Sequence, residues 1–397
     1  MKKVFLDISH DACWTSQLDL KKQEQFFLTN GYELVFYPAA ADMIVLNTCA
    51  YDQQHEDESL IKLKRFKKLN PKANVVVAGC LSKISPDSLK NAGILLAASP
   101  MDEGRAYDEI KDPPLPGNLI RHSGKIRIEA LILHFSCAAY ILFKKIGLLT
   151  KGLRTINAFG QASSSKTIFI RVARGCIGRC SFCAIRYARG RLISRPIEDI
   201  AKEISESCDK GFKNIYLVAD NLGAYGLDIG GNICFLLDAI HSLGTKCELY
   251  LGNCEPEPLL KFKQDFISLF SKNIISYVCI PLQSGSDDLI AKMNRNYKVK
   301  DVINLMKSIK AVSPNTVIST MLLVGFPGET QEDFEMTLKL FKENVIDFAI
   351  INSYSERPNT AAINLQPKVT AEEKNRRFRK VSLINNVRLL KDIFILR

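Results

Sequence analysis

Hydrophobic and polar positions alternate between short apolar runs and amphipathic segments along most of the chain. In the first 110 residues, apolar runs predict four strands, at 4–6, 33–36, 43–46 and 75–78. Amphipathic segments between them predict two helices, at 17–29 and 58–68. Strands separated by helices favour a parallel sheet with helical crossovers, so we expect an α/β domain at the amino-terminal end.

The same alternation resumes at residue 166. Apolar runs predict six further strands, at 167–172, 214–218, 247–251, 276–282, 317–324 and 348–354. Helical patterns lie between them, at 196–207, 233–242, 259–271, 302–311 and 332–344. The predicted fold class is therefore α/β, with an amino-terminal parallel-sheet domain followed by a partial (βα)6 barrel. Functional residues of such a barrel lie at the carboxyl ends of its strands.

Segments rich in Pro and Gly, together with a Gly/Ser-containing joint, divide the chain into parts. Within the connector, the apolar stretch 130–143 is too short to cross a bilayer, and we interpret it as a buried or docking helix. The predicted parts are an amino-terminal domain (1–115), a connector (116–165), the barrel (166–365) and a basic helical tail (366–397).

Composition narrows the class of protein. The 397 residues include 54 Lys and Arg against 42 Asp and Glu, a net charge of +12, and 47% are hydrophobic, which excludes wholesale disorder. Twelve cysteines in so long a chain exclude a small disulfide-stapled secreted fold. Asp7 interrupts the first apolar run too early for an export signal. We therefore expect a cytoplasmic protein with mostly reduced thiols and no membrane partner.

Three cysteines, Cys176, Cys180 and Cys183, lie within eight residues directly after a predicted strand. Thiolates are the natural ligands of iron–sulfur clusters, and tight spacing lets one loop enclose one cluster. Three cysteines leave one iron of a 4Fe–4S cluster open to a substrate or cofactor. A structural zinc loop, which needs a fourth ligand, and plain buried cysteines are the alternatives.

A second set of cysteines follows three predicted strands of the first domain: Cys13, Cys49 and Cys80. Because the carboxyl ends of parallel strands share one edge of a sheet, these thiols can converge on a second site, again one ligand short of four. Separate buried cysteines are the alternative. We expect the other six to be mostly small buried hydrophobic residues: Cys137, Cys208, Cys234, Cys247, Cys254 and Cys279.

The CxxxCxxC spacing, with Phe182 before its last cysteine, resembles the signature of the radical S-adenosylmethionine enzymes. Both triads together resemble one family of that superfamily, the methylthiotransferases, over nearly the whole chain. Further stretches match the family's motifs: Asn47 to Cys49, Ala78 to Cys80, Ala224 to Asp228, Ile280 to Ser286, Met293 to Arg295, Gly325 to Thr330 and Tyr354 to Pro358.

This family inserts sulfur and a methyl group into unactivated C–H bonds. The resemblance implies that Cys176, Cys180 and Cys183 hold the catalytic, radical-generating 4Fe–4S cluster. It implies that Cys13, Cys49 and Cys80 hold a second 4Fe–4S cluster, which carries the sulfur. S-adenosylmethionine and a reductant protein such as flavodoxin or ferredoxin are the implied partners. Contacts with S-adenosylmethionine are expected at strand ends, with ordinary turn residues as the alternative: Phe182, Gln283, Ser284, Gly325, Pro327 and Gly328.

Several positions depart from the family pattern and leave both triads intact. Where the family usually has Gly, Asn, Gln, His and Gly, this chain has Ala12, Ser16, Ala219, Cys279 and Asn359. The last motif is followed by a helix-like segment rather than a strand-rich one. We therefore expect that the chain lacks the family's carboxyl-terminal RNA-binding domain, called TRAM.

Two segments concentrate positive charge. Residues 166–195 carry eight basic and no acidic side chains, and 366–397 carry nine basic and three acidic ones. Both favour a polyanionic substrate such as tRNA, with a solvated basic face as the alternative. We expect methylthiolation of a modified adenosine next to the tRNA anticodon, in the branch that acts on threonylcarbamoyladenosine. The other hypotheses are methylthiolation of a protein or peptide residue, as in the ribosomal-protein Asp type, and a non-catalytic Fe–S or RNA-binding protein.

Overall fold

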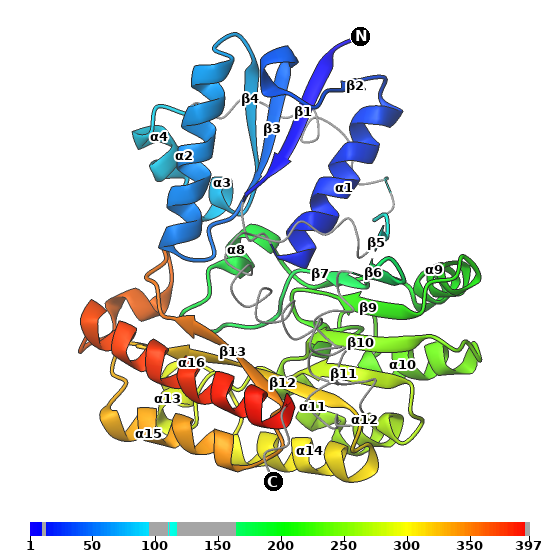
Figure 1. Cartoon of the computed structure of the whole chain (residues 1–397), viewed down its shortest axis with the longest axis vertical. Helices are drawn as coiled ribbons and strands as arrows, with labels where there is room; N and C mark the ends of the chain where they lie inside the picture. Colours follow the sequence, from blue (N-terminus) through cyan, green and yellow to red (C-terminus); the bar gives the residue numbers. More distant parts are fainter. Residues whose placement is uncertain (10–12, 95–109, 111, 117–163, 394–397) are drawn as a thin grey trace.

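The computed structural model describes residues 1–9, 13–94, 110, 112–116 and 164–393. These residues form a four-stranded sheet, a seven-stranded sheet and a two-stranded ribbon (Figure 1). The apolar stretch 130–143 and Cys137 lie outside the described residues. Within the described part of the chain, no helix combines the length and the apolar content that crossing a bilayer requires.

The amino-terminal sheet is parallel, with strand order β2-β1-β3-β4. Its strands confirm the predicted α/β alternation: β1 (Lys3–Ile8), β2 (Glu33–Leu34), β3 (Met43–Thr48) and β4 (Asn74–Gly79). Helices follow β1, β3 and β4: α1 (Trp14–Thr29), α2 (Gln53–Leu69), α3 (Leu81–Ile84) and α4 (Pro86–Asn91). Helix α2 begins where the Asp52 carboxylate accepts the backbone N–H of His55 at 2.8 Å, a side-chain cap.

The second sheet contains six parallel strands in chain order, as predicted, and is open rather than closed into a barrel. They are β6 (Thr167–Arg171), β9 (Asn214–Val218), β10 (Glu248–Asn253), β11 (Ile275–Cys279), β12 (Val317–Val324) and β13 (Phe348–Ser353). Strand β5 (Leu115–Pro116) adds to the β6 edge in the antiparallel sense. The ribbon pairs β7 (Ala173–Arg174) with β8 (Ile193–Ser194).

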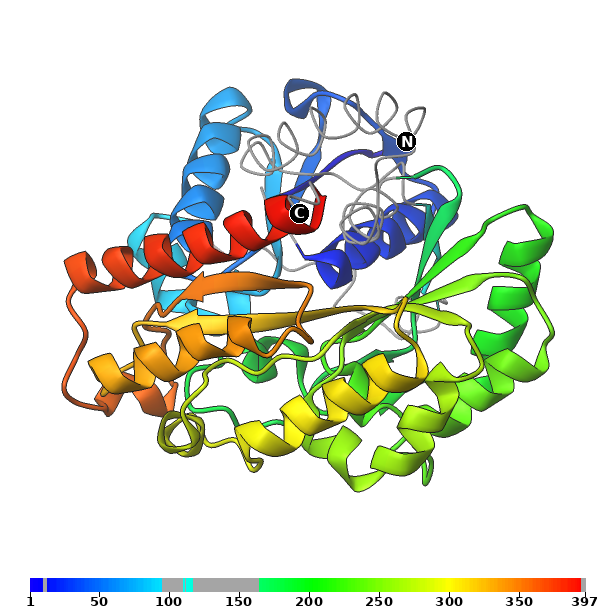
Figure 2. The same ribbon diagram turned by 60° about the horizontal axis from the view of Figure 1, so that its bottom comes forward.

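Helices cover one face of this curved sheet, whereas the amino-terminal domain and the last helix, α16 (Ala371–Ile393), lie on the other (Figure 2). The predicted helix 259–271 is two helices that meet at Phe262, and the predicted helix 332–344 ends in a 3-10 turn after Lys339. The helices between the strands are α9 (Ile197–Asp209), α10 (Ile233–Ser242), α11 (Pro256–Lys261), α12 (Lys263–Phe270), α13 (Asp287–Lys292), α14 (Val299–Val312) and α15 (Gln331–Lys339).

Aromatic rings line the concave face of the sheet. The ring of Tyr216 stacks on Phe169 and on Tyr250, with centroids 4.6 and 4.5 Å apart. Trp14, at the start of α1, packs 5.1 Å from the Phe169 ring and 5.3 Å from the Tyr216 ring. Because offset and edge-on aromatic contacts add to the area buried, this cluster fixes α1 against the barrel strands.

One cysteine pair differs from the expectation of separate thiols. Cys208, near the end of α9, and Cys247, just before β10, are joined in a disulfide across a Cα separation of 6.5 Å. Thirty-nine residues separate them in sequence. The helical crossover returns the chain beside β9, and this return brings the two side chains together, which local patterns do not reveal.

Candidate active site

The amino-terminal cysteine triad lies at the carboxyl edge of the first sheet. Cys49 and Cys80 directly follow β3 and β4, and both are buried, whereas Cys13 precedes α1 and is exposed. The Asn47 side chain donates to the Ser16 carbonyl at 3.0 Å, which ties the start of α1 to the end of β3. The parallel topology therefore places Cys49 and Cys80 at one edge of the sheet, and the Asn47 contact holds the start of α1, next to Cys13, at that same edge.

The three thiols lie within electrostatic range of one another. Burial raises the pKa of Cys49 far above its ordinary value, and the nearby Cys13 and Cys80 raise it further. Burial also raises the pKa of Cys80 to about 11, although Arg189 lowers it. Three thiolates here would repel one another in a poorly solvated site, so their joint ionisation would require a bound cation such as iron.

The second triad lies in the loop between β7 and α8 (Ile185–Arg189). Gly175 opens the loop with φ +77°, and a Cβ there would stand 1.9 Å from the Arg191 carbonyl oxygen, so only glycine fits. The Gly178 N–H donates to the Cys176 sulfur at 3.2 Å, and the Asn221 amide donates to the same sulfur at 3.7 Å. Donors aimed at a sulfur stabilise its thiolate form.

The other two cysteines of this loop lie beside it. Burial and the neighbouring Cys180 raise the pKa of Cys183 to about 12, although Arg295 acts to lower it. Arg295 is buried, with 8% of the residue exposed. Its guanidinium forms an ion pair with Glu255 and donates to the Pro281 carbonyl at 3.2 Å. A fixed cation therefore faces the thiols of this loop.

Both triads fit an iron–sulfur cluster better than a single ion. Each offers sulfur donors only, in threes, with an arginine within electrostatic range. Among the described residues, no three or more Cys, His, Asp or Glu side chains are arranged to hold one metal ion. Because a cluster spreads its ligands over several irons, its thiolates stand further apart than those around one ion. The assignment of the six cysteines as cluster ligands stays a prediction.

Helix α8 connects the two triads physically. Directly after Cys183, the side chains of Ala184, Ile185 and Ala188 pack into the core of the amino-terminal domain, beside α3. Tyr51, which is 47% exposed, lies within electrostatic range of both Cys49 and Cys183. The two triads therefore face each other across the junction of the two sheets.

Three of the residues predicted to contact S-adenosylmethionine are held in place by packing or hydrogen bonds. The Phe182 ring packs edge-on against Phe326, with centroids 6.4 Å apart. Gln283 adopts φ +67° and bonds through its backbone to β12. The Ser284 hydroxyl is fully buried, lies 3.2 Å from the Thr337 hydroxyl and accepts the Ser286 N–H at 3.1 Å. The hydroxyl of Ser284 thus stabilises the Ser284–Ser286 turn that leads into α13.

The turn Gly325–Gly328 follows β12, and the tail closes over it. The Gly328 N–H donates to the Pro367 carbonyl at 2.8 Å. A Cβ at Gly325, where φ is +75°, would stand 2.4 Å from the Cγ of Lys374. Pro327 lies buried between the two glycines. These glycines permit a close backbone approach, and in the described structure the segment that approaches them is the tail.

Several functional side chains were not identified from the sequence. Arg189 bonds to Asp19 and donates to the Ser16 hydroxyl at 2.8 Å, and Asp220 accepts the Gly175 N–H at 2.9 Å. Of these, Ser16 is a departure from the family pattern, and it also lies 3.3 Å from the Cys13 sulfur. Their partners are distant in sequence, so the only sequence signal for these side chains is their position near the cysteine motifs.

The positive charge near the cysteine loop is smaller than its composition indicates. Arg171 is buried and pairs with Asp19 at 2.7 Å and with Asp112 at 3.1 Å. Arg195 pairs with Glu203 at 2.6 Å. Arg189 is also paired, so three of the eight basic residues at 166–195 have their charge offset by carboxylates of the fold. The exposed ones are Lys166, Arg179, Arg186 and Arg191.

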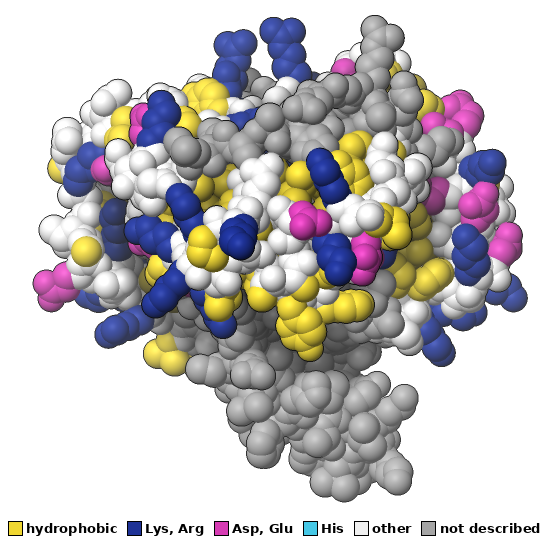
Figure 3. Space-filling model, turned by 90° about the horizontal axis from the view of Figure 1, so that it is seen from above, with side chains coloured by type: hydrophobic (Ala, Val, Ile, Leu, Met, Phe, Trp, Pro, Cys, Tyr) yellow, Lys and Arg dark blue, Asp and Glu magenta, His cyan; other side chains and the backbone are white. Residues whose placement is uncertain are grey.

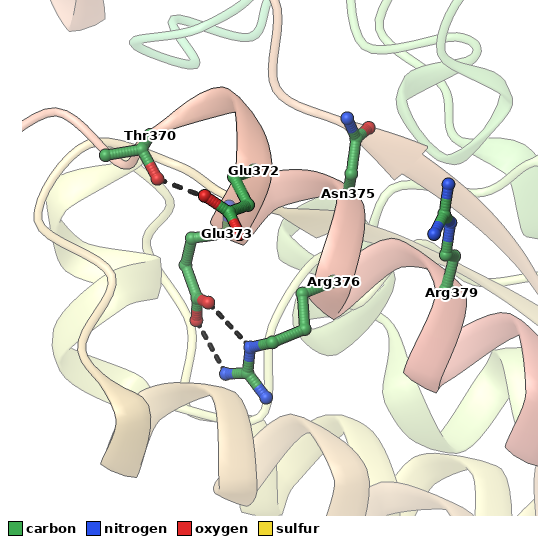
Figure 4. A pocket seen from close by; sticks show the side chains of 6 residues that line it. All are labelled: Thr370, Glu372, Glu373, Asn375, Arg376 and Arg379. Carbon is green, nitrogen blue, oxygen red and sulfur yellow. Dashed lines mark hydrogen bonds and ion pairs between the residues drawn. The ribbon is translucent and has the colours of Figure 1, made fainter.

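Two surface cavities lie on α16 and not between the triads. One, of about 660 Å³, lies over its first turns, where Glu373 pairs with Arg376 at 2.6 Å (Figure 4). The other, of about 750 Å³, is an apolar groove between α15 and α16, lined by Leu338, Leu383 and Val387 among others. Neither contains a cysteine, so neither belongs to the candidate site.

Comparisons with known proteins agree with both halves of this site. Residues 7–97 match the family described as "Uncharacterized protein family UPF0004", and residues 170–341 match the "Radical SAM superfamily". A Histophilus somni protein named tRNA-2-methylthio-N(6)-dimethylallyladenosine synthase is 30% identical, over 94% of this chain and 75% of that protein. The Thermotoga maritima protein named threonylcarbamoyladenosine tRNA methylthiotransferase MtaB is 28% identical, over 92% and 78%.

Solved structures agree with the fold. TsrM from Kitasatospora setae, a radical S-adenosylmethionine methyltransferase, is similar with a TM-score of 0.60 at 16% identity, over 91% of this chain and 75% of that one. The cobalamin-dependent radical enzyme OxsB gives a TM-score of 0.53 at 11% identity, over 97% and 56%. At these identities the likeness concerns the arrangement of both sheets.

Proposed function

Because the chain belongs to the methylthiotransferase family of the radical S-adenosylmethionine superfamily, we propose that it adds a methylthio group to a modified adenosine beside a tRNA anticodon. Enzymes of this family use S-adenosylmethionine and 4Fe–4S clusters. The proposal of a tRNA substrate draws on the relatives, which are named for tRNA nucleosides.

The observation that carries the proposal is the pair of facing cysteine triads. Cys49 and Cys183 both interact electrostatically with Tyr51, although they belong to different sheets. Sulfur transfer needs a radical source and a sulfur source close to one substrate atom, and proximity of this kind accounts for a large share of catalysis. Two triads, each one ligand short of four, meet that need.

The residues have distinct roles in this scheme. Cys176, Cys180 and Cys183 would hold one cluster, and Cys13, Cys49 and Cys80 the other. When bound, one cluster would supply the electron that cleaves S-adenosylmethionine to methionine and a 5′-deoxyadenosyl radical, and the other would supply the sulfur. Another S-adenosylmethionine would supply the methyl group.

The surrounding side chains orient and screen these ligands. Arg295 and Arg189 offset the negative charge of the thiolates, and the Gly178 N–H fixes the Cys176 sulfur. Burial of Cys49 and Cys80 keeps bulk water from two of the three amino-terminal thiols. We also propose Phe182, Gln283 and the Gly325–Gly328 turn as contacts for S-adenosylmethionine, since Gln283 and the turn follow the neighbouring strands β11 and β12 and the Phe182 ring packs against Phe326 in that turn. The Ser284 hydroxyl would support that loop.

The site also implies partners that the comparisons leave open. A reductant protein such as flavodoxin or ferredoxin must deliver the electron, because no described side chain is a reductant. We place this chemistry in the cytoplasm, where tRNA is modified.

Mass spectrometry of tRNA nucleosides tests the proposal. Deletion of the gene should abolish one methylthio-nucleoside, and the wild-type gene should restore it. The Cys176→Ala variant should fail to restore it, while Cys234→Ala, a change at a buried cysteine of α10, should succeed. The mass that disappears separates the dimethylallyl from the threonylcarbamoyl product. An unchanged nucleoside profile after deletion would refute a tRNA substrate.

A further inference from the structure

The far end of α2 carries the densest unassigned positive charge in the described structure. Between residues 59 and 86 the sequence has no acidic residue. Five basic side chains there are exposed: Lys64, Arg65, Lys67, Lys68 and Lys72. Lys67 donates to the Gly93 carbonyl at 2.9 Å, and no ion pair is recorded for the other four among the described residues. Their charge is therefore not neutralised by the fold.

Two adjacent aromatic side chains project beside this helix end. Phe36 is 90% exposed and Tyr37 is 74% exposed. Two exposed rings side by side form an apolar patch, and an apolar patch rimmed by polar residues marks a contact site. From above, the side of the molecule that carries α2 shows Lys and Arg side chains with hydrophobic ones between them (Figure 3).

The backbone under these rings is held firmly. Asn70, which caps the end of α2, donates its amide to the Pro38 carbonyl at 2.9 Å and to the Ala41 carbonyl at 2.8 Å. The Val35 N–H donates to the Val4 carbonyl at 2.9 Å. The aromatic pair and the basic helix end are therefore joined through Asn70, and the rings are preorganised for contact.

We propose that this surface, formed by Phe36, Tyr37 and the five basic residues at 64–72, binds an unpaired segment of the tRNA body. The lysines and the arginine would contact phosphates, and the two rings would stack on bases. The inference rests on the proposed function and adds a second contact for the same substrate. Basic side chains interleaved with exposed aromatics are the pattern of single-strand RNA surfaces.

The position of the surface fixes which part of the RNA it contacts. Helix α2 begins at Gln53, four residues after Cys49, and runs for 17 residues. At 1.5 Å per residue its far end lies about 25 Å from its start beside the cysteine triad. A nucleoside held at the triads therefore cannot reach this surface. The segment bound here belongs to a part of the tRNA outside the anticodon loop.

An acidic reductant protein is the competing partner for a basic surface. Electron transfer weakens steeply with distance, so a donor seated a helix length from the triad is badly placed to reduce a cluster. Exposed aromatic rings also suit stacking on bases better than contact with acidic side chains. The observations favour RNA as the partner. The experiment below also measures binding of a reductant protein, so that it can tell the two partners apart.

The test compares full-length tRNA with the isolated anticodon stem-loop, on the cluster-loaded enzyme. One variant removes the rings (Phe36→Ser with Tyr37→Ser), and a second removes charge (Lys64→Gln, Lys68→Gln and Lys72→Gln). The matched control removes three exposed charges from the barrel: Lys210→Gln, Lys213→Gln and Lys246→Gln. Iron content and circular dichroism check that all variants fold.

Both surface variants should bind full-length tRNA about tenfold more weakly, while binding of the stem-loop stays unchanged. The charge variant should lower the slope of log affinity against log salt by roughly 2, close to 0.7 per lost phosphate contact on a single strand. The barrel control should lower neither affinity.

Unchanged affinity for full-length tRNA in both variants would overturn the inference, as would an equal loss for the stem-loop. Selective loss of flavodoxin binding, with tRNA binding intact, would also overturn it and assign the surface to the reductant. These outcomes are separate from the proposed function, which fails if the wild-type enzyme leaves tRNA unmodified.

Discussion

The guanidinium of Arg357, after β13, and the carboxylate of Glu56, on α2, form an ion pair buried where the two sheets meet. The same guanidinium donates to the Ser85 hydroxyl at 3.0 Å. Nearby, the Gln53 N–H donates to the Ser355 hydroxyl at 3.0 Å. This contact joins α2, which begins beside Cys49, to the mouth of the barrel, and so fixes the orientation of one triad relative to the other.

Loss of this ion pair should destabilise the protein strongly. The Arg357→Ala variant leaves the Glu56 charge buried without its partner, which costs about 3–5 kcal/mol in the free energy of unfolding. Denaturant unfolding measures the loss. Lys202→Ala, which removes an exposed contact with Glu206 at 4.0 Å, should change stability by less than about 0.5 kcal/mol. Equal stability of the two variants would contradict the role of the pair.

Acid should weaken the same junction through Asp19. Burial by itself raises the pKa of this carboxyl, but Arg171 and Arg189 outweigh burial and hold the pKa well below its ordinary value of 3.8. Because the folded pKa lies below the unfolded one, Asp19 contributes stability above pH 3.8, and that stability is lost as the pH falls further.

Unfolding curves measured between pH 7 and pH 2 should therefore show a steep loss of stability below about pH 4. The Asp19→Asn variant should be less stable at neutral pH and should lose less on acidification. A variant with the wild-type acid dependence would show that Asp19 is not the responsible group.

Removal of one triad should halve the iron. After anaerobic reconstitution, the triple variant Cys13→Ala, Cys49→Ala and Cys80→Ala should hold about half the iron and sulfide of the wild type, because one of two equal clusters is lost. Cys254→Ala, at a buried cysteine outside both triads, should keep the full content. Equal iron in the triple variant and the wild type would exclude an amino-terminal cluster.

Gly79 should tolerate no side chain. Its φ is +85°, and an added Cβ would lie 2.4 Å from the Thr48 carbonyl oxygen, a backbone atom that cannot withdraw. Gly31 has φ +75° with open space around it, so Gly31→Ala should cost only about 1–2 kcal/mol of backbone strain.

Gly79→Ala should cost clearly more stability than Gly31→Ala and should lower iron content, because it displaces Cys80. Thermal unfolding and iron analysis of the two variants decide the point. Equal effects would mean that the neighbouring strand yields without moving the cysteine.

Arg295 should tune the cluster of the second triad. Its positive charge acts on Cys180 and Cys183, so Arg295→Gln removes charge that stabilises the reduced, more negative cluster. The reduction potential, measured by potentiometric EPR titration, should become more negative by tens of millivolts, about the scale of nearby charge changes. Arg295→Lys should restore most of the shift. An unchanged potential in Arg295→Gln would place the arginine outside the cluster's field.

The amino-acid sequence by itself determined the local structure and the donor set. The apolar runs at 214–218 and 317–324 coincide with β9 and β12, because a strand buried on both faces is apolar throughout its length. The close spacing of Cys176, Cys180 and Cys183 places all three thiols in a single loop. The positions of Cys49 and Cys80 after strands already place them at one sheet edge, since parallel topology forces that result.

Only the tertiary structure decided which charges act on the thiols and which parts of the chain cover the site. Arg189, Arg295 and Arg357 look alike in the sequence, yet the first two face different triads and the third joins the sheets. The tail closes over Gly328 through Pro367, thirty-nine residues later. Such roles depend on which surfaces meet when distant segments pack together, and local periodicity carries no information about those meetings.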